Sequence, residues 1–144
     1  MASSKTGKRS PAPADPRPEI REENGRHLLV GGRCGHCGLA SAYAPPICPC
    51  GQVGGVEPCT FGPSGTVFSS TVLEIPVPGR TPPVCLAYVD LDEGPRILAH
   101  VELDSGPPPE PGAKVSLNVK NDLGDLVVSI GSTPVLDNHG AHND

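Results

Sequence analysis

Alternation of apolar and polar side chains is the dominant pattern in the second half of this chain, and it predicts β-strands rather than helices. In one run Val115, Leu117 and Val119 fall on one face, with Ser, Asn and Lys on the other. An earlier run turns its apolar side chains to one face and Arg96 and His100 to the other. Five such runs predict five strands, at residues 65–75, 83–91, 95–103, 114–120 and 126–130.

The connections between these runs carry their own signals. The sequence "DEGP" (92–95) predicts a tight turn in which Gly94 is available for a positive φ. The sequence "DSGPPPEPG" (104–112) holds too many prolines for a helix and predicts an extended loop. Five short antiparallel strands after a small cysteine-rich module favour a mainly β protein with a partly open five-stranded barrel, the OB fold. A small β-sandwich is the competing architecture.

Composition divides the chain into four parts. Residues 1–24 have almost no apolar content, which predicts a disordered tail. Residues 25–60 begin with a short strand at 28–30 and hold a cysteine cluster, which predicts a zinc ribbon. Residues 61–132 form the predicted OB-fold barrel, and the polar residues 133–144 are expected to be a flexible C-terminus.

Overall composition narrows the class further. The 144 residues include 19 prolines and no tryptophan, so helix should be scarce. No apolar run approaches the roughly 18 residues of a membrane span, and no apolar core follows the basic N-terminus as in a secretory signal. We therefore expect a cytoplasmic protein without a membrane partner. Its thiols should stay reduced, and paired cysteines then indicate metal ligands before disulfides.

Charge is distributed unevenly along the chain. The net charge of −5 is the balance of +3 over residues 1–33 and −8 over the remainder. An acidic body is a poor match for a phosphate backbone, because nucleic-acid binding needs a basic surface. We expect no nucleic-acid partner and interpret the basic start as a solvated arm.

Four cysteines form the strongest chemical motif. Cys34 and Cys37 make a C-x-x-C pair followed by glycine, and Cys48 and Cys50 make a second pair after a ten-residue loop. Two such turns facing each other predict a tetrahedral four-sulfur site of the kind that zinc favours. The second pair is one residue shorter than usual. Two other side chains could replace a missing ligand, namely Cys59 and His36.

Other chemistries fit this cluster less well. A redox pair needs a C-x-x-C at a helix N-terminus, and the residues after Cys37 do not predict a helix. A nucleophilic cysteine needs a base and an orienting group, and none clusters nearby in the sequence. Iron in place of zinc stays open, since the ligands are the same. Cys85 is expected to be a small buried hydrophobe, and His100 a solvated or neighbour-bonded residue.

The order and spacing of three longer segments support a family resemblance. "GRCGHCG…PPICPCG", "PSGTVFSSTVLEIP" and "PVCLAYVDLDEGPRILAHV" resemble the family that joins a rubredoxin-like zinc ribbon to an OB fold. The likeness covers roughly residues 28–130. This family began as a domain of unknown function and is described as acyl-CoA-associated. By resemblance, the zinc ligands, one ion per chain, are Cys34, Cys37, Cys48 and Cys50.

The resemblance implies a non-catalytic accessory subunit of a thiolase-superfamily enzyme, such as a thiolase, a retro-aldolase or an acyltransferase. The catalytic residues would then lie in a thiolase-like partner, in some cases joined by a hot-dog-fold hydratase. This chain would stabilise that partner in a hetero-oligomer and shape its acyl-CoA site, with a CoA thioester at the interface. The family's usual N-terminal docking helices are replaced here by a proline-rich segment.

Two alternatives stay open at this point: a zinc-ribbon OB-fold module that binds nucleic acid, and an iron-bearing rubredoxin-like electron carrier. Only four aromatic residues are present, so a docking surface would be aliphatic and lined by proline. The segment 73–84, "LEIPVPGRTPPV", is a candidate for such a surface, or it simply connects two strands. Arg80, Arg96 and Lys114 could meet phosphate groups, but each is better explained as a solvated charge.

Overall fold

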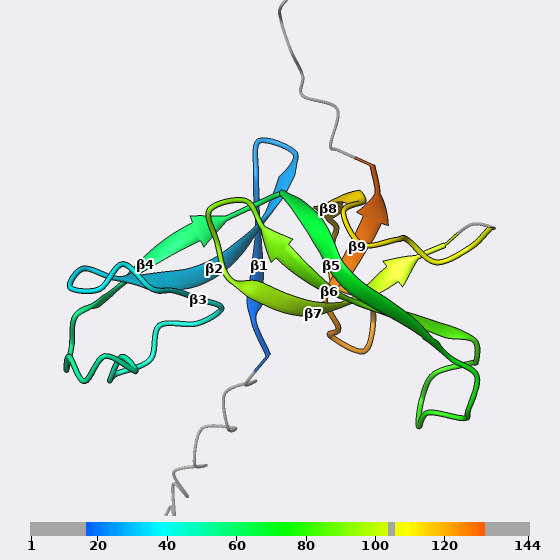
Figure 1. Cartoon of the computed structure of the whole chain (residues 1–144), viewed down its shortest axis with the longest axis horizontal. Helices are drawn as coiled ribbons and strands as arrows, with labels where there is room; N and C mark the ends of the chain where they lie inside the picture. The colour runs from blue at the N-terminus through cyan, green and yellow to red at the C-terminus, as the bar shows by residue number, and fades with distance from the viewer. Residues whose placement is uncertain (1–16, 104–105, 132–144) are drawn as a thin grey trace, which may run out of the picture.

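The structure is a computed structural model that describes residues 17–103 and 106–131. The described residues form nine β-strands and no helix, with a small sheet beside a closed barrel (Figure 1). The strands are β1 (Glu19–Glu23), β2 (Arg26–Cys34), β3 (Ala40–Ser41), β4 (Val56–Phe61), β5 (Ser64–Leu73), β6 (Val84–Leu91), β7 (Arg96–Glu102), β8 (Lys114–Leu117) and β9 (Val127–Ile130). Within these ranges nothing has the length and hydropathy of a membrane-spanning helix.

The small sheet is built on β2, the strand that carries the first cysteine. β1 and β3 pair with successive parts of one edge of β2, and β4 pairs with the other edge. β1 lies in the segment that was predicted to be disordered, so that prediction is wrong for Glu19–Glu23, while residues 1–16 lie outside the described part. The pattern EIREE has one apolar residue, Ile20, and gives little strand signal. The pairing with β2 supplies the hydrogen bonds that the local sequence cannot predict.

The barrel confirms the predicted fold class. Each of the five expected runs forms one strand, and the closed order is β5-β6-β7-β9-β8, with β8 pairing back to β5. One pairing differs from the expected antiparallel pattern, because β9 runs parallel to β7. Parallel neighbours need a long crossover. The chain provides one, since it leaves β7, forms β8 and returns to insert β9 between them.

A single hydrophobic core fills the barrel and extends into the small sheet. The predicted alternation is confirmed in β7, where Ile97, Ala99 and Val101 point inward and are buried. It fails at Val119, which was expected to share the inner face of β8 but is 61% exposed because the strand ends at Leu117.

One residue from each of two sheet strands joins this core, and the ribbon and barrel meet there. Leu29 of β2 and Phe61 of β4 belong to the same buried cluster as the barrel residues. Arg33 stacks over the Phe61 ring at 5.5 Å and donates a hydrogen bond to the carbonyl of Glu93 in the β6–β7 turn. The ribbon is therefore continuous with the barrel rather than a separately packed module.

The β6–β7 turn corrects the expected role of its glycine. The residue with positive φ is Glu93, at 54°. Gly94 is needed instead for close approach, because a Cβ there would lie 2.9 Å from Cδ1 and 3.0 Å from Cβ of Phe61. The absence of a side chain at Gly94 lets the turn pack directly on that ring.

We expect Gly94→Ala to lower the free energy of unfolding by about 1–3 kcal/mol, because the added methyl group must push the Phe61 ring away in a packed core. Urea unfolding measures this change. Glu93→Gly is the matched control, and its effect should stay within about 1 kcal/mol, since relief of the left-handed backbone offsets the added freedom of the unfolded chain. Equal effects of the two variants would contradict this account of the turn.

Candidate metal centre and apolar cavity

The structure brings the four predicted cysteines together. The sulfur atoms of Cys34, Cys37, Cys48 and Cys50 all lie within 4.8 Å of one another. The Sγ atoms of Cys34 and Cys50 are 3.9 Å apart, and those of Cys37 and Cys48 are 3.5 Å apart. Zinc–sulfur bonds of about 2.3 Å in a tetrahedron place sulfurs about 3.8 Å apart, so these distances suit one metal ion.

Two tight turns hold the sulfurs in place, and they differ by one residue. In the first, the N–H of Gly38 donates to the carbonyl of Cys34, four residues back. In the second, the N–H of Gly51 donates to the carbonyl of Cys48, only three residues back. Both glycines have a positive φ, of 79° and 94°. The shorter C-x-C pair is therefore accommodated by a tighter turn, and both of its sulfurs reach the cluster.

Neither expected substitute side chain belongs to this cluster. Cys59 pairs with Gly31 in the β2–β4 ladder, and its side chain packs against the core. His36 takes part through its backbone, because its N–H lies 3.4 Å from the sulfur of Cys34. Among the described residues, the ligand set that the geometry supports is the original four cysteines.

Electrostatics in the cluster favour one thiolate and oppose several. Hydrogen bonds from the backbone N–H groups of Cys37 and His36 lower the pKa of Cys34 to about 6. The backbone N–H of Cys50 also lowers the pKa of Cys48, but burial and the neighbouring thiols outweigh it and raise that pKa to about 12. A bound cation reverses this balance, since a coordinating thiol loses its proton outright. The cluster is thus suited to a cation held by four thiolates.

Three further residues singled out in the sequence, Cys85, Arg96 and Lys114, have structural roles: one is buried and two are hydrogen-bonded. Cys85 is buried in β6, and its burial raises the pKa of its thiol. Arg96 forms two hydrogen bonds with Asp90, and the ammonium group of Lys114 donates to the hydroxyl of Thr66 at 2.9 Å.

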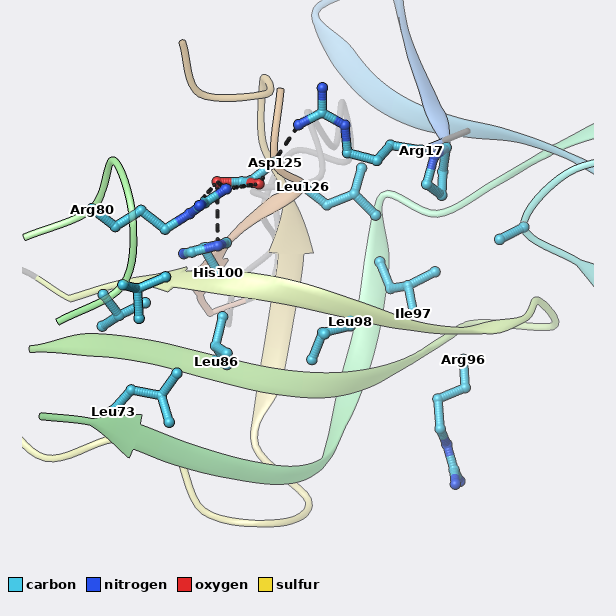
Figure 2. A pocket seen from close by; sticks show the side chains of 14 residues that line it. Arg17, Leu73, Arg80, Leu86, Arg96, Ile97, Leu98, His100, Asp125 and Leu126 are labelled. Atoms are coloured by element: carbon cyan, nitrogen blue, oxygen red, sulfur yellow. Dashed lines mark hydrogen bonds and ion pairs between the residues drawn. The ribbon is translucent and has the colours of Figure 1, made fainter. Parts of the chain in front are cut away.

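A second candidate site is an apolar cavity of about 500 Å³ that no cysteine lines (Figure 2). Its walls come from β5, β6 and β7, from the loop between β5 and β6, from the loop before β9, from the residue after β3 and from the two residues before β1. The lining residues are Arg17, Pro18, Ala42, Leu73, Val77, Arg80, Val84, Leu86, Arg96, Ile97, Leu98, His100, Asp125 and Leu126. Four of them lie in the segment 73–84 that was considered as a docking surface.

A charged network around Asp125 forms the polar end of this cavity. Arg80 donates to both carboxylate oxygens, at 2.6 and 3.0 Å, and Nε2 of His100 lies 3.3 Å from Oδ2 (Figure 2). Asn121 adds a hydrogen bond at 3.1 Å. The bonds from Arg80 lower the pKa of Asp125 against the effect of burial, with smaller contributions from Asn121 and His100. Sequence reasoning missed this network, because its members are far apart along the chain.

Comparison with known proteins finds relatives of the barrel region. Residues 60–120 match the family model described as "ChsH2, C-terminal OB-fold domain". No curated protein matches the chain. A solved structure titled "Ltp2-ChsH2(DUF35) aldolase" contains a chain that is similar at 27% identity, with a TM-score of 0.57 over 71% of this chain and 82% of that chain. The family resemblance drawn from the sequence is confirmed. The matched residues 60–120 include four of the five barrel strands, β5 to β8, and the cysteine cluster lies before them.

We expect Cys50→Ser to reduce the metal content of the purified chain from about one ion to well below half of that, because a closed structural site needs its fourth thiolate. Elemental analysis of the gel-filtered protein measures the ratio. Cys59→Ser is the control and should keep the full content. Acid should also release the ion, since protons compete for the thiolates. Full metal content in Cys50→Ser would remove that residue from the ligand set.

We expect Asp125→Asn to lower the free energy of unfolding at neutral pH by about 1–3 kcal/mol, since it removes the charge that Arg80 binds. Because the folded pKa of Asp125 is lowered, its contribution is fully present above the unfolded value of about 3.9 and is lost as pH falls below it. The difference between the two proteins should therefore shrink on acidification below about pH 4. Unfolding curves at several pH values test this.

Asp90→Asn is the matched control for that measurement. Asp90 also binds an arginine through both oxygens, but its side chain is 45% exposed against 12% for Asp125. Solvent screens the exposed pair, so its loss should cost about 1 kcal/mol or less. A larger effect at Asp90 than at Asp125 would show that burial does not govern the strength of these pairs.

Proposed function

We propose that this chain is a non-catalytic accessory subunit of a thiolase-superfamily acyl-CoA enzyme, with a structural zinc ion held by its four-cysteine cluster. The observation that carries the proposal is the similarity, over most of both chains, to a chain of the structure titled "Ltp2-ChsH2(DUF35) aldolase". That title names an assembly of two components with an aldolase activity. By analogy, this chain forms a hetero-oligomer with a thiolase-like subunit that holds the catalytic residues, in some assemblies together with a hot-dog-fold hydratase.

Zinc is proposed from the chemistry of the site. Four thiolates that complete a tetrahedron leave no open position, which is the arrangement of structural rather than catalytic zinc. Bound zinc would fix the loop between β2 and β4 and so define the end of the molecule that carries it. The same sulfurs accept iron, and visible absorption distinguishes the two ions. Reduced thiols are required in either case, which supports a cytoplasmic location.

The proposed effect on the partner is structural. The barrel would stabilise the thiolase-like subunit and complete the wall of its acyl-CoA site. Acyl specificity then belongs to the complex as a whole, and loss of this chain should lower the stability of the partner and its turnover together.

Co-expression with the thiolase-like protein encoded nearest to this chain tests the proposal. We expect the two proteins to co-purify with about one zinc per accessory chain, because a closed four-thiolate site holds one ion. Activity of the partner should be largely lost when it is expressed alone and restored when this chain is added. Cys50→Ser should weaken the complex, and Cys59→Ser should not. A monomer that ignores the partner would overturn the proposal, and an iron-containing monomer would favour the electron-carrier alternative.

A further inference from the structure

The four thiols of the cysteine cluster differ in exposure. Cys34 and Cys48 are buried, whereas Cys37 and Cys50 are exposed. Each tight turn therefore supplies one buried and one exposed thiol to the same cluster. Hydrogen bonds follow the same division, because backbone N–H groups of the two turns donate to the sulfurs of Cys34 and Cys48. The exposed thiols are thus the part of the cluster that a reagent in solution meets first.

Two short sulfur–sulfur distances each join an exposed thiol to a buried one. Sγ of Cys37 lies 3.5 Å from Sγ of Cys48, and Sγ of Cys50 lies 3.9 Å from Sγ of Cys34. Both pairs also connect one turn to the other, so we name them the cross-turn pairs. An exposed sulfur that is oxidised has a reduced neighbour within reach, and that neighbour is shielded from solvent. An accessible cysteine beside a second cysteine that resolves it is typical of redox-sensing sites.

Metal-bound sulfurs are also in the reactive ionisation state. A thiol that coordinates a cation loses its proton outright, and the thiolate is the nucleophile in oxidation. The thiolate of Cys37 or Cys50 attacks one oxygen of a hydroperoxide, which breaks the O–O bond and leaves a sulfenic acid on sulfur. The buried thiolate of the same cross-turn pair then attacks that sulfur, an S–S bond forms, and the sulfenic oxygen leaves as water after protonation. With hydrogen peroxide, four thiolates, two peroxide molecules and four protons give two disulfides and four water molecules.

This oxidation removes the metal ligands but keeps the segment closed. The sulfurs of a disulfide are no longer thiolates, so the first disulfide removes two of the four ligands that a closed structural site needs. A zinc ion would leave without a change in its own oxidation state, because zinc has no redox chemistry. Each cross-turn disulfide joins the two turns covalently, so the oxidised chain still holds together the loop between them.

We propose that the cysteine cluster is a reversible oxidation site, at which a hydroperoxide joins each cross-turn pair as a disulfide and releases the metal ion. This assignment rests on the proposed function for the presence of zinc, and it adds a way in which the metal content responds to an oxidant. Loss of metal through Cys50→Ser is expected to weaken the complex with the thiolase-like partner. Oxidation should therefore weaken that complex as well, until a dithiol reductant and zinc restore the site.

Hydrogen peroxide added to the full, zinc-loaded chain without a partner tests the proposal. We expect release of about one zinc per chain, measured with a chromogenic chelator, and loss of four of the six thiols. Dimedone, which traps sulfenic acids, should label Cys37 and Cys50 rather than the buried pair. A dithiol reductant with added zinc should return the metal content to its starting value.

Peptide mapping without reduction identifies the disulfides. Chymotrypsin cleaves after Tyr43, which lies between the two turns. Cross-turn disulfides leave the two fragments linked, and tandem mass spectrometry should assign the partners as Cys37–Cys48 and Cys34–Cys50. Fragments that separate would show disulfides within each turn and overturn the assignment.

Cys59→Ser is the matched control, because Cys59 lies in the same segment but outside the cluster. This variant should release zinc as fast as the wild type and form the same two disulfides. Zinc that stays bound while Cys59 of the wild type is oxidised would overturn the oxidation site alone and leave the accessory function standing. A disulfide that includes Cys59 would also overturn it. A chain that is purified without zinc would overturn the proposed zinc site and the oxidation site together.

Discussion

The cysteine cluster is the constraint on which residues 35–60 depend. Between residues 35 and 60, all of which the structure describes, the one buried side chain is that of Cys48. This segment has no hydrophobic core of its own, and it contacts the barrel core only through partly buried side chains, those of Ala40, Ala42 and Cys59. Its two strands are held by pairing with β2, and the loops around the four sulfurs are held by two turns that end in glycine. A divalent cation bound by the four sulfurs would stabilise the fold of this loop, as buried Leu, Ile and Val side chains stabilise the barrel.

Sequence reasoning predicted what is local. Alternation located all five barrel strands, because one face of each strand is buried and the other is solvated. Cysteine spacing located the four sulfurs, because the two cysteines of each pair lie within one tight turn. The stretch Glu19–Glu23 was missed because its only strong determinant is a partner strand, and Gly94 was assigned the wrong role because the constraint is the Phe61 ring, more than 30 positions away.

The cavity shows the same limit at the level of the site. Arg80, His100 and Asp125 come from a proline-rich loop, a strand and a second loop, and no spacing rule connects them. Considered alone, Arg80 was interpreted as a solvated charge and His100 as a solvated or neighbour-bonded residue, and nothing in the sequence singled out Asp125. Their association becomes visible only once the parallel β7–β9 pairing has brought the loop before β9 next to β7. An arginine and an aspartate 45 positions apart, like Arg80 and Asp125, occur in most sequences, so this spacing does not predict an ion pair.

The shared core also bears on how such a protein can change over time. Leu29 of the ribbon and Phe61 at the end of β4 occupy the same buried cluster as the barrel side chains, although the region that matches the OB-fold family begins only at residue 60. A recombination event that cut the gene at that position and joined the barrel to a foreign N-terminal half would leave the place of Leu29 unfilled. The two halves must therefore be inherited together, or the barrel must first acquire another side chain that fills the place of Leu29.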